Sequence, residues 1–287
     1  MGISDIKVTK ASGIKQLFSI KRLIKSLRKS GATRETALQI AKEVSKDLYE
    51  GISTKKIYRL AFNKLKSNAG HLAARYHLKA GILELGPSGF PFERFVAALL
   101  SEQGYSVLVG EIVKGKCVNH EIDVIAEKGN QHFMIECKFH NLKGTVSDVK
   151  IPLYIQSRFK DVESSWVNIP GHSAKFHQGW VVNNTRFTHD AINYGKCAGL
   201  NLISWDYPKN NGLKDIIDDL GLYPLTCLTS LTRIEKQKLL DMKVVLCKEL
   251  CNNSFLLKKI GISSNREKKI LAEGHQLCNI LSKNGKH

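Results

Sequence analysis

The stretch Asn119–His140, NHEIDVIAEKGNQHFMIECKFH, decides the fold of this chain. Two runs rich in β-branched and apolar residues, Glu121–Ala126 and His132–Cys137, flank Lys128-Gly129-Asn130. Two such runs around a short glycine-containing turn predict a β-hairpin. Because side chains alternate along a strand, we expect Ile122, Val124 and Ala126 to share one face of the first strand.

Charged residues interrupt both predicted strands. Asp123 lies on the first strand, and Glu136 and Lys138 lie on the second, both on the same side. Two carboxylates and an amine on adjacent strands can hold a divalent metal and place a water molecule beside it, which is a site for hydrolysing phosphodiesters. The alternative is a surface hairpin with solvated charges. The apolar residues around the charges favour buried strands, where charged side chains are rarely without a role.

The pattern Asp123…Glu136-Cys137-Lys138 resembles the core motif of the PD-(D/E)xK nuclease superfamily, and its Mrr-like restriction endonucleases in particular. The resemblance covers residues 86–207. It implies Mg²⁺ or Mn²⁺ bound by Asp123, Glu136 and the backbone carbonyl of Cys137, with Lys138 activating water. It also implies that Glu93, on the preceding helix, joins the site; its alternative role is charge complementarity at the helix N-terminus.

The segments after the hairpin predict an α/β domain with a mixed sheet flanked by helices. Residues 145–162 have helical periodicity, with Pro152 expected to delay or distort the helix. Gln156 and Arg158 on this helix are candidates for contact with phosphate or a metal-bound water, as the resemblance implies. A strand over 178–184, a helix through Cys197 and a strand over 200–205 then predict a right-handed crossover.

The N-terminal segment predicts a hairpin over 6–18 followed by four helices, the last over 69–80. This arrangement resembles the ATP-cone, a nucleotide-binding regulatory domain. The resemblance implies that ATP or dATP binds at Val8, Lys10, Gly13, Phe18 and Lys21. Ala11 departs from the family, which often has arginine there. The alternative is a helical docking or DNA-binding domain with solvated lysines.

The C-terminal segment, residues 223–287, predicts a basic helical tail. Leu257–Ser263, followed by a helix over 266–280, resembles half of a helix-hairpin-helix, in which a glycine turn brings backbone amides to a phosphate. A small helical bundle used for packing or oligomerisation is the alternative. We therefore place domain boundaries at 85/86 and 222/223.

Charge is distributed unevenly along the chain. Residues 1–86 hold 18 Lys and Arg against 6 Asp and Glu, residues 87–225 hold 14 against 15, and residues 226–287 hold 12 against 5. A near-neutral middle between basic flanks suits an acidic metal site with nucleic-acid-binding surfaces. The seven cysteines form no C-x-x-C pair, and the first residues have no apolar signal region, so we expect reduced thiols and a cytoplasmic location without membrane contact.

These features together predict a metal-dependent DNA endonuclease that restricts foreign DNA under the control of ATP or dATP. Cleaving both strands of a duplex and the ATP-cone resemblance both favour a homo-oligomer, a dimer or larger. Two alternatives stay open. One is a nucleotide-sensing DNA-binding regulator without cleavage, and the other is a nuclease that acts on RNA or branched DNA.

Overall fold

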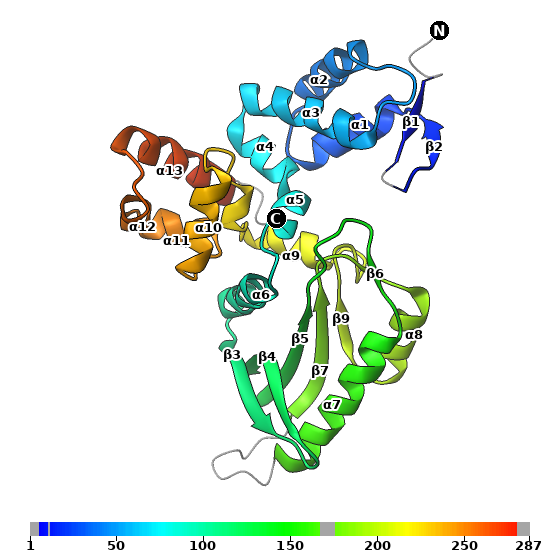
Figure 1. Ribbon diagram of the computed structural model, residues 1–287, viewed down its shortest axis with the longest axis vertical. Helices are drawn as coiled ribbons and strands as arrows, with labels where there is room; N and C mark the ends of the chain where they lie inside the picture. The colour runs from blue at the N-terminus through cyan, green and yellow to red at the C-terminus, as the bar shows by residue number, and fades with distance from the viewer. Residues whose placement is uncertain (1–5, 11, 167–175, 280–287) are drawn as a thin grey trace, which may run out of the picture.

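The computed structural model describes residues 6–10, 12–166 and 176–279. It contains a five-stranded mixed sheet in the order β3-β4-β5-β7-β9, in the lower half of the view in Figure 1. The first three strands are antiparallel, and β5, β7 and β9 are parallel. Their bounds are β3 Ser106–Lys114, β4 Asn119–Lys128, β5 Gln131–Lys138, β7 Phe176–Asn183 and β9 Asn201–Ile203. The predicted hairpin and the mixed sheet are thus present.

Helices cover both faces of the sheet. Helix α6 (Phe90–Glu102) packs its apolar side on the face that carries Val124, Ile135 and Val182. Helices α7 (Lys150–Trp166) and α8 (His189–Cys197) cover the other face, where Phe159 of α7 contacts the cluster around Met134. This sandwich of helices around a mixed sheet fits a restriction-endonuclease core.

The alternation of side chains in β4 is interrupted at Asp123. Val124 and Ala126 lie in the cluster under α6, but Ile122 lies in the cluster under α7. The prediction that these three side chains share one face is therefore wrong for Ile122. Gly110 of β3, which faces this point of β4, has a φ of 72°. A positive φ in a strand marks a local irregularity, which is the physical reason for the change of face.

Helix α7 begins later than its periodicity predicts. The helix starts at Lys150, so that Pro152 falls in its first turn, where a missing backbone N–H costs no hydrogen bond. The residues before it form the short strand β6 (Val146–Ser147), which pairs with β8 (Arg186–Phe187). The prediction that Pro152 delays the helix agrees with this start.

The N-terminal segment contains a two-stranded hairpin, β1 (Lys7–Thr9) and β2 (Lys15–Leu17), followed by helices. The helices are α1 Ile20–Lys29, α2 Arg34–Lys46, α3 Thr54–Asn68, α4 Gly70–Tyr76 and α5 Leu78–Leu83. Thr33 and Ser53 cap α2 and α3 by accepting hydrogen bonds from backbone N–H groups. The single helix expected over 69–80 is divided into α4 and α5 at His77.

The C-terminal segment is not a detached tail. After α9 (Leu213–Leu220), which precedes the expected boundary at 222/223, the segment comprises η2 Leu225–Cys227, α10 Arg233–Asp241, α11 Cys247–Asn252, α12 Phe255–Lys259 and α13 Ser264–Asn279. Its leucines, such as Leu225 and Leu239, share one hydrophobic core with Ile82 of α5 and Phe95 of α6. The core is thus continuous across the expected boundary at 85/86. Ile280, the expected last residue of α13, lies outside the described residues.

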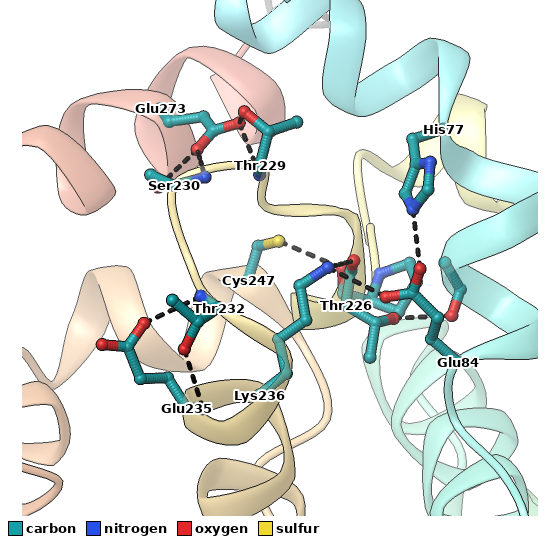
Figure 2. Close-up of polar contacts among 12 residues, drawn as sticks. His77, Glu84, Thr226, Thr229, Ser230, Thr232, Glu235, Lys236, Cys247 and Glu273 are labelled. Atoms are coloured by element: carbon teal, nitrogen blue, oxygen red, sulfur yellow. Dashed lines mark hydrogen bonds and ion pairs between the residues drawn. The ribbon is translucent and has the colours of Figure 1, made fainter. Parts of the chain in front are cut away.

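Polar contacts reinforce this junction (Figure 2). His77 contacts Glu84 through Nε2 and Oε1 at 2.9 Å, and Lys236 of α10 contacts the other oxygen of Glu84 at 2.9 Å. Thr226 donates a hydrogen bond to the Gly81 carbonyl at 2.7 Å. Glu84 is therefore held from both the N-terminal and the C-terminal segment.

The seven cysteines are all free thiols, as expected from their spacing. Burial raises the pKa of Cys137 and Cys227 well above the usual thiol value, which keeps both protonated. None of the helices in the described ranges combines the length and the apolarity needed to cross a membrane.

Candidate functional site

The hairpin opens where its two strands carry charge. The backbone pairing of β4 with β5 ends at Val124 and Ile135. Beyond that point, Oδ2 of Asp123 accepts a hydrogen bond from the Cys137 backbone N–H at 2.7 Å. The Asp123 carboxylate thus replaces a backbone carbonyl as the acceptor for the Cys137 N–H group, and Cys137 directly follows Glu136. This contact fixes the two acidic positions relative to each other.

Glu136 lies on the α7 side of the sheet, as the alternation of β5 predicts. Its Oε2 accepts a hydrogen bond from Nη1 of Arg158 at 2.6 Å. Both side chains are mostly buried, with 19% of Glu136 and 12% of Arg158 exposed. Lys138 lies on the same side, and among the described residues its ammonium group has no hydrogen bond or ion pair. The amine is thus free to contact another group.

Glu93, in the first turn of α6, belongs to the same electrostatic cluster. Burial and the charges of Asp123, Glu121 and Glu136 raise its pKa to about 7. Burial likewise raises the pKa of Asp123 and, together with the Asp123 charge, that of Glu136. Carboxylates that repel one another in a partly buried site favour either protonation or a bound cation. The repulsion among these acids would therefore be reduced by a bound cation.

Gln156 of α7 makes no hydrogen bond to Asp123, Glu136 or Lys138. Its Oε1 is buried and has no hydrogen-bond partner among the described residues. A buried amide oxygen without a donor is uncommon, because it loses its contact with water and gains nothing in return. Its neighbour on the helix, Arg158, is the one that contacts an acid of the site.

A buried polar network supports the segment after Lys138, and sequence reasoning did not predict it. The side-chain amide of Asn184 accepts a hydrogen bond from the His140 backbone N–H at 2.8 Å and donates one to the His140 carbonyl at 2.9 Å. Ser147 contacts both the His140 ring and Asn183. Polar residues at the end of the strand over 178–184 were the available signal, but a pattern along the chain does not reveal their partners.

The donor set suits a hard divalent cation. Carboxylate oxygens of Asp123 and Glu136 and the Cys137 carbonyl are ligands that Mg²⁺ and Mn²⁺ accept, with waters completing the shell. No group of three His, Cys, Asp or Glu side chains in the described part of the chain is arranged to hold a metal by itself. Since Mg²⁺ is usually held by one or two carboxylates with waters and phosphate, the residues fit the ion.

The residues expected to bind nucleotide divide into two groups. Val8 and Phe18 are buried in the N-terminal core and line a cavity of about 180 Å³, together with Tyr58 and Tyr76. Lys10, Gly13 and Lys21 are exposed, and they are not among the residues that line this cavity. Ala11, where the ATP-cone pattern is broken, lies outside the described residues.

Two family models match the chain. The model described as "Restriction endonuclease" matches residues 86–207, and the one described as "AF1548-like, C-terminal" matches residues 223–278. The C-terminal segment thus matches a family other than the helix-hairpin-helix that Leu257–Ser263 resembles. Neither model covers residues 1–85, and an ATP-cone is not among the matches that these comparisons give.

A relative and a solved structure each match about two thirds of the chain. The chain is 35% identical over 186 residues to an uncharacterized protein of Archaeoglobus fulgidus; the match covers 63% of this chain and 99% of that protein. It also resembles the crystal structure of AF1548, a protein of unknown function, with a TM-score of 0.55 and 33% identity over 67% of this chain and 99% of that one. The chain therefore belongs to the AF1548-like family and carries a restriction endonuclease domain at residues 86–207.

Proposed function

We propose that this protein is a metal-dependent endonuclease that hydrolyses DNA phosphodiester bonds. The observation that carries the proposal is the convergence of Asp123, Glu136 and Lys138 at the open end of one hairpin, inside a restriction endonuclease domain. The raised pKa values of the acids support it, because shifted carboxylates cluster at sites that bind cations or move protons.

In this proposal each residue has a distinct role. Asp123 and Glu136, with the Cys137 carbonyl, would hold Mg²⁺ or Mn²⁺, and the ion would supply Lewis acidity toward the phosphate and its attacking water. Lys138 orients the water and stabilises negative charge on the phosphate as it develops. Asn184 holds the backbone at His140 and so limits the motion of Lys138. Glu93 adds a negative charge beside the ligands, and Gln156 is the further polar candidate on α7.

Incubation with supercoiled plasmid tests the proposal. Wild-type protein is expected to nick or linearise the plasmid in Mg²⁺ or Mn²⁺ and to leave it intact in EDTA. Single-stranded DNA, branched DNA and RNA in parallel reactions distinguish the substrate classes. Plasmid binding without cleavage of any nucleic acid would favour the DNA-binding regulator instead. A role in restricting foreign DNA is a separate part of the proposal and is tested by phage plating on cells that express the protein.

Control by ATP or dATP is the second part of the proposal. The hairpin with its helices and the cavity beside Tyr58 support it. Tyr58 contacts the nuclease domain, because Lys143, on the loop after Lys138, lies 5.6 Å from its ring centroid. The Tyr58 hydroxyl is 3.0 Å from Nδ1 of His77, which in turn contacts Glu84. A ligand that moves Tyr58 would thus act on both neighbouring segments.

Calorimetry and sedimentation test this control. ATP or dATP is expected to bind the wild-type protein and to change its oligomeric assembly or its cleavage rate. Replacement of Lys10 and Lys21 by alanine should remove the response. The matched control replaces Lys15 and Lys25, which are exposed on the same hairpin and the same first helix. Absence of nucleotide binding to the wild type, with unchanged sedimentation, would leave the nuclease without this regulation.

A further inference from the structure

Arg158 makes more contacts than a surface arginine would. Its guanidinium donates to Glu136 at 2.6 Å and to the backbone carbonyl of Glu121. It also lies over the ring of Tyr154, 5.5 Å from the ring centroid. These contacts hold one end of the side chain against the acids of the candidate site, and 12% of the side chain is exposed.

The position of this cation coincides with the place where a metal is expected. Burial raises the pKa of both Asp123 and Glu136, and the Asp123 charge raises that of Glu136 further. In the described structure, Arg158 supplies the positive charge that makes two ionised acids tolerable there. A divalent cation on the same carboxylate would stand close to the guanidinium, and like charges at short range repel.

We infer that Arg158 is an exchangeable counter-cation, which holds Glu136 in the metal-free protein and is displaced from it when a divalent ion binds. This inference rests on the proposed function, because it assumes that Glu136 is a metal ligand. Arg158 is a positioning residue in this role. The contacts with Glu121 and Tyr154 keep the guanidinium beside the site after it leaves Glu136.

The exchange predicts that a substitution of Arg158 increases the affinity for metal instead of decreasing it. Loss of a purely structural support loosens the ligands and weakens metal binding. Loss of a competing cation instead strengthens it. Arg158→Gln removes the charge and keeps a polar side chain that can donate hydrogen bonds. We expect it to bind Mn²⁺ about 3- to 10-fold more tightly than wild type, because the divalent ion no longer has to displace the guanidinium from Glu136.

Titration calorimetry with Mn²⁺ and thermal unfolding in EDTA give two readouts that do not depend on cleavage. In Arg158→Gln the melting temperature in EDTA should fall, and the increase on adding saturating Mn²⁺ should be larger than in wild type. Arg158→Lys keeps a cation and should bind Mn²⁺ as wild type does. The matched control is Lys160→Ala on the same helix, since Lys160 pairs with Glu163 and is 59% exposed; it should change neither readout.

The outcomes separate the inference from the function. If Mn²⁺ binds wild type and is lost in Glu136→Gln, but folded Arg158→Gln binds it equally or more weakly, the exchange is wrong and the metal site stands. If Mn²⁺ does not bind wild type, or binds Glu136→Gln unchanged, the metal site fails and the exchange fails with it. Should Arg158→Gln not fold in EDTA, Arg158→Lys decides, because a tighter Mn²⁺ site in that variant contradicts competition by charge.

Discussion

Glu136 and Glu273 are both largely buried carboxylates, and they have opposite environments. Glu273 of α13 accepts hydrogen bonds from the backbone and the hydroxyl groups of Thr229 and Ser230, so each of its oxygens has two donors (Figure 2). Among the described residues, Glu136 accepts one hydrogen bond, from Arg158, and the nearby Asp123 charge raises its pKa. Within the described residues, the oxygens of Glu273 thus have four hydrogen-bond donors, whereas those of Glu136 have one.

In the proposed function, this difference separates structural acids from acids that bind a cation. A buried carboxylate whose donors come from its own chain fixes a turn, as Glu273 does for Thr229 and Ser230. Neighbouring carboxylates without enough hydrogen-bond donors lower the stability of the fold. Proteins keep such clusters where a bound ligand compensates for the loss of stability. The same contrast separates Glu235, which pairs with Arg266, from Glu93, which faces other acids.

The largest effect is expected from exchanging the acids for amides at the two sites. Glu136→Gln should lower plasmid cleavage by about 100-fold or more, because it removes a charged ligand from the reacting centre. Its free energy of unfolding in EDTA should change by less than about 1 kcal/mol, since a repelling charge is lost as well. Gel assays and denaturant unfolding measure the two quantities.

Glu273→Gln should do the reverse. An amide has a single acceptor oxygen, and its NH₂ group would face donors, so the free energy of unfolding should fall by about 2–4 kcal/mol. Cleavage should stay within about twofold of wild type at temperatures where the variant is folded. Equal effects of the two variants on cleavage would remove the distinction between the sites.

A smaller effect is expected from the network that supports Lys138. Asn184→Ala removes two hydrogen bonds to the His140 backbone and leaves both groups without their partners. The free energy of unfolding should fall by about 1–3 kcal/mol, and cleavage by about 10-fold, because the segment after Lys138 loosens. Asn193→Ala on α8 serves as the control and should change neither quantity, because the exposed Asn193 amide hydrogen-bonds within the described ranges to His189 alone.

The smallest effects concern pH, and they should have opposite signs at Glu93 and Glu235. Burial and neighbouring acids raise the pKa of Glu93 from 4.5 to about 7. Its ionisation therefore destabilises the folded state fully above pH 7, and this destabilisation disappears as the pH falls to 4.5. Glu93→Gln in EDTA should therefore raise the melting temperature at pH 8 and leave it unchanged at pH 4.

Arg266 lowers the pKa of Glu235 to about 2. A lowered carboxyl pKa adds stability above pH 4.5 that is lost as the pH falls through about 2. Glu235→Gln should thus lower the melting temperature at pH 7, with a difference that vanishes near pH 2. Melting curves of the two variants that shift in the same direction at pH 7–8 would contradict the assignment of one acid to repulsion and the other to pairing.

Sequence reasoning predicted the elements more fully than their contacts. The hairpin over β4 and β5, the delayed start of α7 and the N-terminal hairpin with its helices follow from local patterns of apolar residues and turns. The change of face at Ile122 escaped prediction, since strict alternation assumes a regular strand and Gly110 on the neighbouring strand makes it irregular. Two further features were not predicted: the division of the helix over 69–80 at His77 and the packing of the C-terminal segment. Both depend on contacts with residues distant in the chain.

By itself, the sequence determined that Asp123, Glu136 and Lys138 come to adjacent strands, because short-range alternation and a two-residue turn leave few other arrangements. Only the tertiary structure decided what surrounds them. Arg158 reaches Glu136 across 22 residues, and Asn184 reaches His140 across 44. Burial raises the pKa values of Asp123 and Glu136, and burial is a property of the packed chain, which no local pattern contains.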